Sequence, residues 1–266
     1  MKLYVLDGGR LYLDESLLVA GIHNATLQNQ NPSAQWVATP VISFLVETAA
    51  GYVLYDTGNH PHTNTNASAV YFTWQPEQLM PESLTRLGLA PEDIKYVVQS
   101  HLHSDHVGYL HLFKNAEVFV SDEEFTQAMR LYGLGRFGGA IKRADFESFL
   151  GAQLNWRLIP SDVCEVEICE GVTVVNLGPG HSFGMLGMLA RLPHSGNFLM
   201  CSDAINREEN LGPPPRLPTL LYDSLGYIKS VEFIRRYARE RDARILYGHD
   251  MRQFAGLKKS TEGFYD

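Results

Sequence analysis

The residues best suited to chemistry lie in one short segment, 101–106, whose sequence is HLHSDH. His101, His103, Asp105 and His106 place four potential metal ligands within six residues. Imidazole and carboxylate groups suit zinc, and they also suit iron, manganese or cobalt. The segment follows an apolar run at 94–98, which predicts a buried strand. Because a loop at a strand end can fold its side chains around a metal, we expect a metal site rather than a histidine-rich surface loop.

Three more ligand-type residues occur downstream, each after a hydrophobic run and a small or turn-forming residue. His181 follows the run 172–177, and Asp203 and His249 follow similar runs. In a two-metal site each ion needs four or five ligands, with one position left for water. The segment 101–106 is therefore only part of such a site, and we expect these three residues to complete it.

A DTG turn at 56–58 is predicted at the end of another apolar run. The Asp56 carboxylate can accept a hydrogen bond from the second ring nitrogen of a metal-bound histidine and so orient the ring. An aspartic protease would need two such carboxylates sharing a proton, and the sequence holds no second DTG. Asp56 is therefore predicted to support the metal site, while His60 and His62 are expected to lie outside it.

The elements that position these residues are predicted from hydrophobic periodicity and turn signals. Helices are expected at 81–89, at 121–132, where SDEE fits a capping box, and at 223–241. Runs of strands with helices interspersed indicate sheets packed between helices. The predicted strands are 3–6, 11–13, 41–46, 52–55, 94–98, 118–120, 172–177, 185–190, 198–201 and 245–247.

Three long segments, 24–40, 59–80 and 133–151, are predicted as loops. The last two carry aromatic residues, among them Phe137. Long loops in compact proteins are often functional, and their aromatics can line a substrate pocket or an interface between the subunits of a homodimer. The same side chains could equally extend the core, and the sequence leaves these alternatives open.

Composition limits the classes of partner and location. The 266 residues are 45% hydrophobic and carry a formal net charge of −8. This acidic balance disfavours a nucleic-acid partner, and no apolar run reaches the length of a membrane span. The first residues lack the apolar stretch of a signal peptide, so a cytoplasmic location is expected. Three cysteines without a CxxC pair disfavour a disulfide framework.

The order of these residues resembles the metallo-β-lactamase superfamily, whose HxHxDH signature matches residues 101–106. Further features resemble the bacterial N-acyl homoserine lactonases and the related 4-pyridoxolactonase. These features are LYVLDGGR at 3–10, YDTG at 55–58, SDA at 202–204 and YGHD at 247–250. The resemblance spans nearly the whole chain. It implies an α/β fold, a single domain at 1–266 built as an αββα sandwich, with the site at one edge between two sheets.

The resemblance also implies how the ligands divide between two divalent metal ions. Zinc is the expected metal, with iron, manganese and cobalt as alternatives. Under this division, the first ion is held by His101, His103 and His181, the second by Asp105, His106 and His249, and both by the bridging Asp203.

One position departs from the lactonase pattern. These lactonases usually carry a tyrosine three residues after the bridging aspartate, where its hydroxyl contacts the substrate carbonyl, but this chain has Asn206. An amide can donate a hydrogen bond but cannot readily transfer a proton. Asn206 therefore takes the role weakly, is replaced by a residue such as Tyr109 or Tyr222, or signals a different substrate. Phe137 is a further candidate for substrate contact.

The ligand pattern predicts a two-metal hydrolase. The resemblance implies that it opens a lactone ring, with an N-acyl homoserine lactone as the expected substrate and quorum quenching as the role. Hydroxide held between the ions would attack the carbonyl carbon, and Asp105 would help move a proton to the leaving alkoxide. The alternatives are a hydrolase of another lactone or ester, an iron-dependent oxidoreductase of the superfamily, a nuclease and a thioester hydrolase. The acidic charge disfavours the nuclease, and the 17 residues after His249 are too few for the added domain of the glyoxalase II type.

Overall fold

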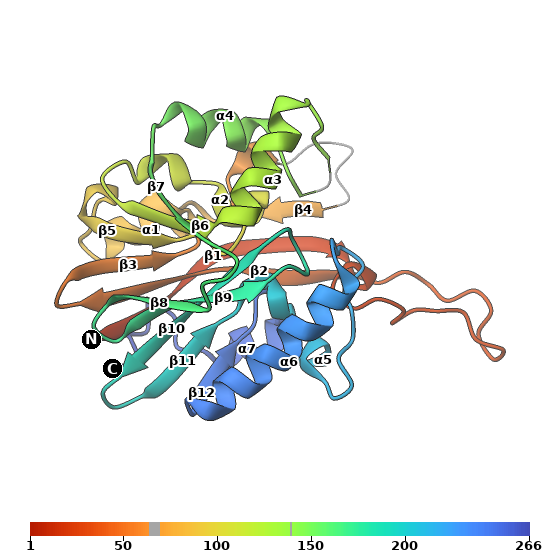
Figure 1. The fold of residues 1–266 in the computed structure, drawn as a ribbon. Coiled ribbons are helices and arrows are strands. Elements are labelled where there is room, and N and C mark those ends of the chain that lie inside the picture. Colours follow the sequence, from red (N-terminus) through yellow and green to blue (C-terminus); the bar gives the residue numbers. More distant parts are fainter. Residues whose placement is uncertain (64–69, 139) are drawn as a thin grey trace.

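Two sheets lie face to face in the computed structural model, which describes residues 1–63, 70–138 and 140–266 (Figure 1). The strands of the larger sheet are β1 (Lys2–Asp14), β2 (Trp36–Thr48), β3 (Gly51–Tyr55), β4 (Val70–Thr73), β5 (Ile94–Val98), β6 (Glu117–Ser121) and β7 (Asn155–Ile159). The strands of the smaller sheet are β8 (Glu165–Cys169), β9 (Val172–Gly178), β10 (Met185–Leu192), β11 (Gly196–Met200) and β12 (Ala243–Leu246). Their orders are β4-β1-β2-β3-β5-β6-β7 and β12-β11-β10-β9-β8.

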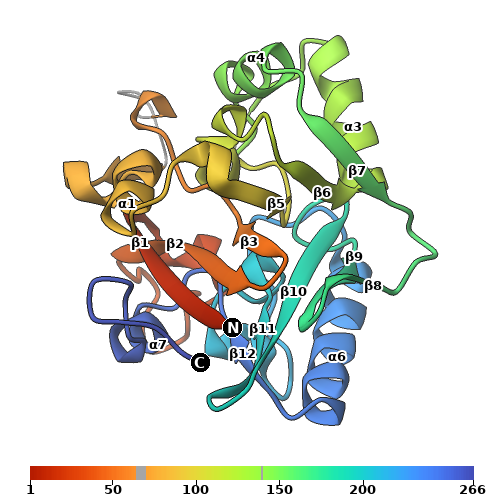
Figure 2. The same ribbon diagram turned by 90° about the vertical axis from the view of Figure 1, so that its left-hand side faces the viewer.

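Helices cover the outer face of each sheet. The helices are α1 (Met80–Arg86), α2 (Ser104–Val107), α3 (Asp122–Gly133), α4 (Arg143–Gly151), α5 (Glu208–Leu211), α6 (Ser224–Glu240) and α7 (Met251–Gly256). In Figures 1 and 2, α1, α3 and α4 lie over the larger sheet and α6 lies over the smaller one. The layers follow the predicted αββα order, so the fold class is confirmed. Across the described residues, every helix is too short or too polar to cross a membrane.

Apolar side chains fill the space between the sheets and the space under the helices. On β5, Val98 belongs to the core between the sheets, whereas Val97 belongs to the core beneath α1, α3 and α4. A strand buried on both faces needs apolar residues at consecutive positions. The third core, under α6, includes Tyr227 and Ile234. The burial of β5 on both faces explains why the apolar run 94–98 predicted its strand correctly.

The two short strands predicted at 3–6 and 11–13 are one long strand, β1, which corrects that prediction. The pairing of β1 with β2 shifts register between Asp7 and Arg10. Gly9 adopts a φ of +101° there, and a Cβ at this position would lie 2.6 Å from the Thr73 carbonyl oxygen. The glycine pair that indicated a break in the sequence therefore forms a bulge inside a continuous strand.

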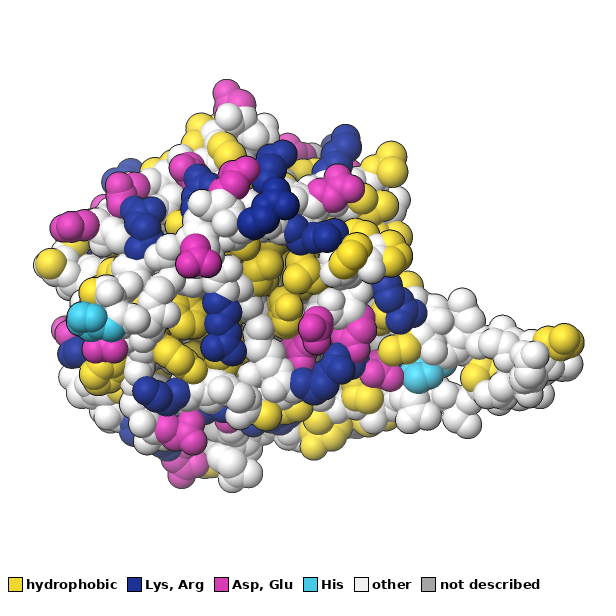
Figure 3. Space-filling model, turned by 90° about the horizontal axis from the view of Figure 1, so that it is seen from below, with side chains coloured by type: hydrophobic (Ala, Val, Ile, Leu, Met, Phe, Trp, Pro, Cys, Tyr) yellow, Lys and Arg dark blue, Asp and Glu magenta, His cyan; other side chains and the backbone are white. Residues whose placement is uncertain are grey.

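Parts of the three predicted loops are regular elements. Residues 36–40 pair with β1 as the start of β2, residues 70–73 form β4, and residues 143–151 form α4. Residues 64–69 of the predicted loop 59–80 lie outside the described residues. The remainder of 24–40 projects from the body of the molecule and carries no charged side chain in 24–35 (Figures 1 and 3). Residues 36–40 and 70–73 are strands because they pair with β1, which is distant in sequence, and local composition does not report such partners.

Candidate metal centre

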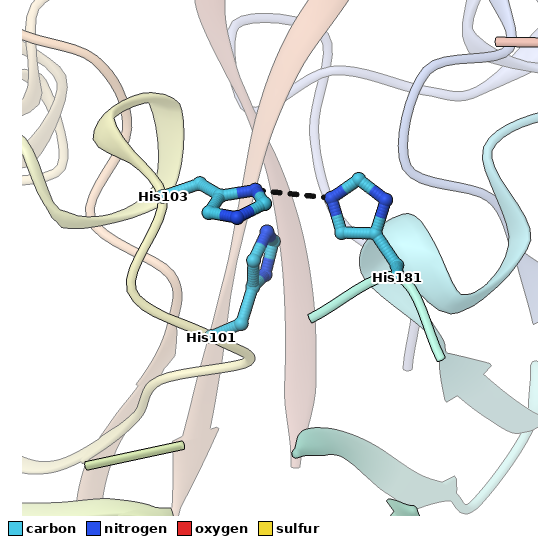
Figure 4. A group of neighbouring side chains, drawn as sticks. All are labelled: His101, His103 and His181. Carbon is cyan, nitrogen blue, oxygen red and sulfur yellow. Dashed lines mark hydrogen bonds between the residues drawn. The ribbon is translucent and has the colours of Figure 1, made fainter. Parts of the chain in front are cut away.

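The seven predicted ligands come together from the ends of strands of both sheets. Strand β5 leads into the segment that holds four of them, and β9, β11 and β12 each lead into one of the others. Their ligand atoms fall into two groups within the described part of the chain, and each group lies within 4.8 Å. The histidine group is His101, His103 and His181 (Figure 4), and the mixed group is Asp105, His106, Asp203 and His249.

The rings of the histidine group converge on one point. His103 Nδ1 and His181 Nε2 lie 3.0 Å apart, as the dashed line in Figure 4 marks. The His101 ring lies edge-on to both, with its centroid 4.4 Å from that of His103 and 5.0 Å from that of His181. The opposite nitrogen of His101, Nδ1, lies 2.9 Å from the Ser100 hydroxyl, which leaves Nε2 facing the group.

Asp203 connects the two groups through its two carboxylate oxygens. Its Oδ2 lies 3.2 Å from His181 Nε2, in the histidine group. Its Oδ1 lies 3.1 Å from His249 Nε2 and 3.4 Å from His106 Nε2, in the mixed group. Asp105 Oδ2 completes the mixed group at 3.3 Å from each of these two ring nitrogens. One carboxylate therefore faces both candidate ion positions.

These separations fit bound divalent cations. Tetrahedral zinc with bonds near 2.0–2.1 Å holds its ligand atoms roughly 3.3 Å apart. His101 Nε2, His106 Nε2 and Asp203 Oδ1 are buried, and no described residue forms a hydrogen bond with them. Leaving such atoms without a partner is costly, and a cation in each group would satisfy them. The residues present therefore fit a divalent metal centre.

The histidine group is neutral near pH 7. Burial lowers the pKa of His101 well below its ordinary value and also lowers the pKa of His181. Burial and the neighbouring His181 lower the pKa of His103 to about 3. Neutral imidazole is the form that binds a metal, so these three rings need to lose no proton before ligation.

The mixed group carries compensating charges. Burial by itself would lower the pKa of His249, but Asp203 and Asp105 raise it to about 10. Burial would likewise lower the pKa of His106, which these carboxylates and Asp56 raise well above its ordinary value. The pKa values of Asp105 and Asp203 are low despite burial, because of the neighbouring histidines. In the absence of metal, protons occupy the place that a cation would take.

Asp56 lies behind the mixed group at the end of β3. Its Oδ2 lies 2.8 Å from His106 Nδ1, so the carboxylate orients the ring whose Nε2 faces the ligand atoms. The same carboxylate accepts hydrogen bonds from the Ser100 backbone N–H and hydroxyl, both at 2.8 Å, and from Gln99 Nε2 at 3.0 Å. Asp56 has a φ of +58°, a conformation that aspartate and asparagine tolerate better than most residues.

His249 is fixed by a close turn after β12. Its Nδ1 lies 3.0 Å from the Pro40 carbonyl oxygen, which makes this nitrogen the donor and leaves Nε2 free for ligation. The preceding residue is Gly248, where a Cβ would lie 2.6 Å from Asp203 Oδ1. A glycine at this position therefore lets the backbone approach the shared carboxylate.

Glu124 is a buried residue that the sequence interpretation assigned to another role. The predicted capping box would direct its side chain to the Ser121 backbone, and only half of that box forms, with Ser121 Oγ accepting from Glu124 N–H. The Glu124 carboxylate instead accepts from Leu102 N–H at 2.9 Å, from Ser182 Oγ at 2.7 and 2.9 Å, and from Gly184 N–H at 3.2 Å. Burial raises its pKa, against the hydrogen bonds, which lower it. A glutamate in a helix's first turn gives no sequence signal for such distant partners.

The two candidate tyrosines flank the ligand segments. Tyr109 lies three residues after His106, is buried, and has its ring centroid 5.0 Å from that of His60. Tyr222 is 56% exposed, packs edge-on against Phe183 at 4.4 Å, and its backbone N–H donates to the Gly180 carbonyl, next to His181.

Asn206 and Phe137 have different surroundings. Asn206 is buried at the end of the turn that carries Asp203, and its carbonyl accepts a hydrogen bond from His249 N–H at 2.8 Å. Its side-chain Oδ1 has no hydrogen-bond partner in the described part of the chain. Phe137 packs against Tyr132 at 5.8 Å and belongs to the aromatic packing beneath α3 and α4.

The fold and this divalent metal centre define a class of protein. Residues 36–249 match the family model of the metallo-beta-lactamase superfamily, and the chain belongs to this superfamily. Among curated proteins, it is 39% identical over 274 residues to the N-acyl homoserine lactonase AiiB of Agrobacterium fabrum, an alignment that covers 100% of this chain and 99% of that protein.

Solved structures resemble this chain over nearly its whole length. A variant of B. thuringiensis AiiA with N-decanoyl-L-homoserine at its active site has a TM-score of 0.82 and 25% identity, and the match covers 99% of this chain and 98% of that one. A second structure, an N-acyl homoserine lactone hydrolase with the product N-hexanoyl-L-homoserine at its catalytic metal centre, has a TM-score of 0.82 and 25% identity. The match covers 99% of this chain and 98% of that one.

Proposed function

We propose that this protein is a metal-dependent lactonase that hydrolyses N-acyl homoserine lactones. The observation that carries the proposal is Asp203, whose two oxygens each face a separate group of buried ligand atoms, at 3.2 Å from His181 and 3.1 Å from His249. The similarity to AiiB over the full chain, at 39% identity, supports the substrate class.

The ligands divide between two ions under this proposal. Zinc is the favoured metal because five of the seven donors are histidines, with iron, manganese and cobalt as alternatives. Asp203 would hold both ions through its two oxygens, and Asp56 would orient His106. The first ion is assigned to His101, His103 and His181, and the second to Asp105, His106 and His249.

When bound, the two ions would supply Lewis-acid chemistry, lowering the pKa of water at the site and stabilising negative charge on the carbonyl oxygen. Asp105 faces the mixed group through Oδ2, and its other oxygen is assigned the relay of a proton from the attacking water to the alkoxide that leaves when the ring opens. Asn206 is assigned a hydrogen bond from its amide N–H to the substrate carbonyl. The burial of the ligands keeps bulk water away from the developing charge.

Tyr109, Tyr222 and Phe137 are the proposed contacts for the acyl chain. Tyr109 lies three residues after His106, and Tyr222 donates its backbone N–H to the carbonyl of Gly180, next to His181, with its ring on the exposed side. Aromatic rings suit an acyl chain because they offer apolar area at low cost in conformational entropy. Alanine at a residue that contacts the chain should raise KM for long-chain substrates more than for short-chain ones.

The test is a substrate panel with the metal-loaded protein. The panel holds N-acyl homoserine lactones of short and long chain, simple γ- and δ-lactones, 4-pyridoxolactone and aryl esters. We expect the homoserine lactones to give the highest kcat/KM, with the ring-opened N-acyl homoserine as the product. Failure of every lactone in the panel would reject the proposal.

A second candidate is a hydrolase of another lactone or an ester, and Asn206 is the observation that favours it. Its amide is shorter than a tyrosine side chain and cannot readily supply a proton. Preference for 4-pyridoxolactone or for a simple lactone over every homoserine lactone would support this candidate. The variant Asn206→Tyr would then be expected to shift the preference toward homoserine lactones.

A further inference from the structure

Glu124 joins the two segments that carry the histidine group. Leu102, which donates its N–H to Glu124 Oε1 at 2.9 Å, lies between His101 and His103. Ser182, whose hydroxyl donates to the same carboxylate at 2.7 Å, directly follows His181. Each of these hydrogen bonds is therefore one residue away from a candidate ligand. A single buried side chain fixes the first segment against the second.

The contact between the second segment and α3 is close. Gly184 donates its N–H to Glu124 Oε2 at 3.2 Å. A Cβ at Gly184 would lie 2.2 Å from Ser121 Oγ, so this segment packs directly on the first turn of α3. Glu124 is fully buried and lies in the first turn of that 12-residue helix, where a negative charge is favourable. The helix and the carboxylate together define where His181 sits.

The buried hydrogen bonds from Leu102 and Ser182 to Glu124 are short, so they restrict the positions of the neighbouring ligands. The 3.0 Å separation between His103 Nδ1 and His181 Nε2 depends on two chain segments that follow strands of different sheets. Among the described residues, Glu124 is the side chain that hydrogen-bonds to both segments of this group. Asp56 has a comparable place behind His106 in the mixed group. Asp56 reaches the histidine group only through the Ser100 hydroxyl, which lies 2.9 Å from His101 Nδ1.

We propose that Glu124 is a positioning residue that sets the affinity of the histidine group for its metal ion. This inference rests on the proposed two-metal site. Glutamine at position 124 would place an amide N–H2 against donors that now meet a carboxylate oxygen, so at least one contact would be lost or repulsive. Loss of a partner behind the ligands typically weakens metal binding about 10–100-fold.

The test compares Glu124→Gln with Glu123→Gln, the neighbouring residue on the same helix, which is exposed. Zinc content after dialysis is measured by elemental analysis, and cobalt titrations are followed by the visible spectrum. We expect two equivalents of metal in the wild type and in Glu123→Gln. In Glu124→Gln, we expect one tight equivalent and a second weakened about 10–100-fold. Two equivalents with wild-type affinity and spectrum in Glu124→Gln would overturn the proposal.

Combining Glu124→Gln with a ligand variant of either group shows which ion the loss of the Glu124 carboxylate weakens. His249→Ala impairs the mixed group, so adding Glu124→Gln should weaken the remaining ion. His181→Ala impairs the histidine group, so adding Glu124→Gln should leave the remaining ion unchanged. Equal weakening in both backgrounds would mean a general loss of structure and would overturn the proposal. If Glu124→Gln fails to fold, Ser182→Ala, which removes one hydroxyl, should weaken the same equivalent by a smaller factor, and no change there would overturn it.

Metal binding is measured without substrate, so the two proposals can fail separately. A wild-type protein that binds two ions but opens no lactone rejects the proposed function and leaves the role of Glu124 standing. A wild-type lactonase whose Glu124→Gln variant retains both ions rejects the role of Glu124 alone. Excess zinc should restore hydrolysis to Glu124→Gln, because the variant has lost affinity and not a reacting group.

Discussion

Asp56 illustrates how a residue outside the ligand set can determine the site. Its carboxylate lies 2.8 Å from His106 Nδ1 and accepts two hydrogen bonds from Ser100, whose hydroxyl also lies 2.9 Å from His101 Nδ1. It therefore acts on ligands of both groups. The oxygen that orients His106 also fixes which ring nitrogen is available to a metal.

Asp56→Asn should weaken metal binding about 10–100-fold, because an amide at this position loses the charge and one acceptor. Asparagine keeps the side-chain shape and tolerates the φ of +58°, so the change tests the hydrogen bonds and not the backbone. Competition with a chelator measures the loss. The control is Asp162→Asn in an exposed turn, which should bind as the wild type does. Unchanged affinity in Asp56→Asn would contradict this role.

At the residue scale, the sequence predicts what is local. HxHxDH places four ligands in one segment, and the strand-end context of His181, Asp203 and His249 predicts the other three. The role of Glu124 could not be predicted from the sequence, because its hydrogen-bond partners lie 22, 58 and 60 residues away. A glutamate at this position also fits the start of a helix. Hydrogen bonds between distant segments leave no spacing pattern in the sequence.

At the element scale, strand ends deliver the ligands and close turns set their approach. Gly248 lies between β12 and His249, and a Cβ there would lie 2.6 Å from Asp203 Oδ1. Gly248→Ala should displace the shared carboxylate, lower metal content and destabilise the fold by about 1–3 kcal/mol. Gly256→Ala, at a position with open space, is the matched control. Metal analysis measures the metal content of the two variants, and thermal unfolding measures their stability. Wild-type metal content in Gly248→Ala would contradict the expected displacement.

The 3-10 turn after β1, Glu15–Leu17, is joined by an ion pair to Arg207, the residue before α5. Glu15 Oε1 lies 2.6 Å from Arg207 Nη1, and the hydrogen bond from Arg207 lowers the pKa of Glu15 below its ordinary value. A carboxyl with a lowered pKa in the folded state stabilises the fold above its ordinary pKa of 4.5, and this stabilisation is lost as the pH falls through the lowered value.

Glu15→Gln should therefore cost about 1–2 kcal/mol at pH 7 and less at pH 3, so its loss of stability on acidification is shallower than that of the wild type. Urea unfolding at pH 3 to 7 measures the difference. Glu77→Gln changes an exposed glutamate and should follow the wild-type curve. A constant difference between Glu15→Gln and the wild type at every pH would contradict the ion-pair account.

The strands that the sequence missed or divided depend on pairing partners that are distant in the chain. Strand β1 appeared as two pieces because its glycine bulge looks like a turn, and α4 was hidden in a segment with glycines on its N-terminal side. Strands β7 and β8 have several exposed positions and so lack the apolar run that revealed β5. Local composition predicts buried strands well and sheet edges poorly.

For the whole molecule, the metal centre joins loops from both sheets, so metal and fold stability are linked. Asp203 and the five histidines of the site are buried, and Asp105 is partly buried beside them. A ligand present at 1,000 times its Kd stabilises the folded state by about 4 kcal/mol. Chelation should therefore lower the Tm by several degrees and added zinc should restore it, as calorimetry can show. An unchanged Tm would mean that no ion occupies these groups.

The central claim is that two ions held by the seven ligands open a lactone ring. The most direct measurement is a titration of metal-free protein with zinc, following bound metal and hydrolysis of an N-acyl homoserine lactone in the same samples. We predict negligible hydrolysis without metal and a steep rise as the second equivalent binds. Equal hydrolysis by metal-free and metal-loaded protein, or full activity with neither group occupied, would contradict the account.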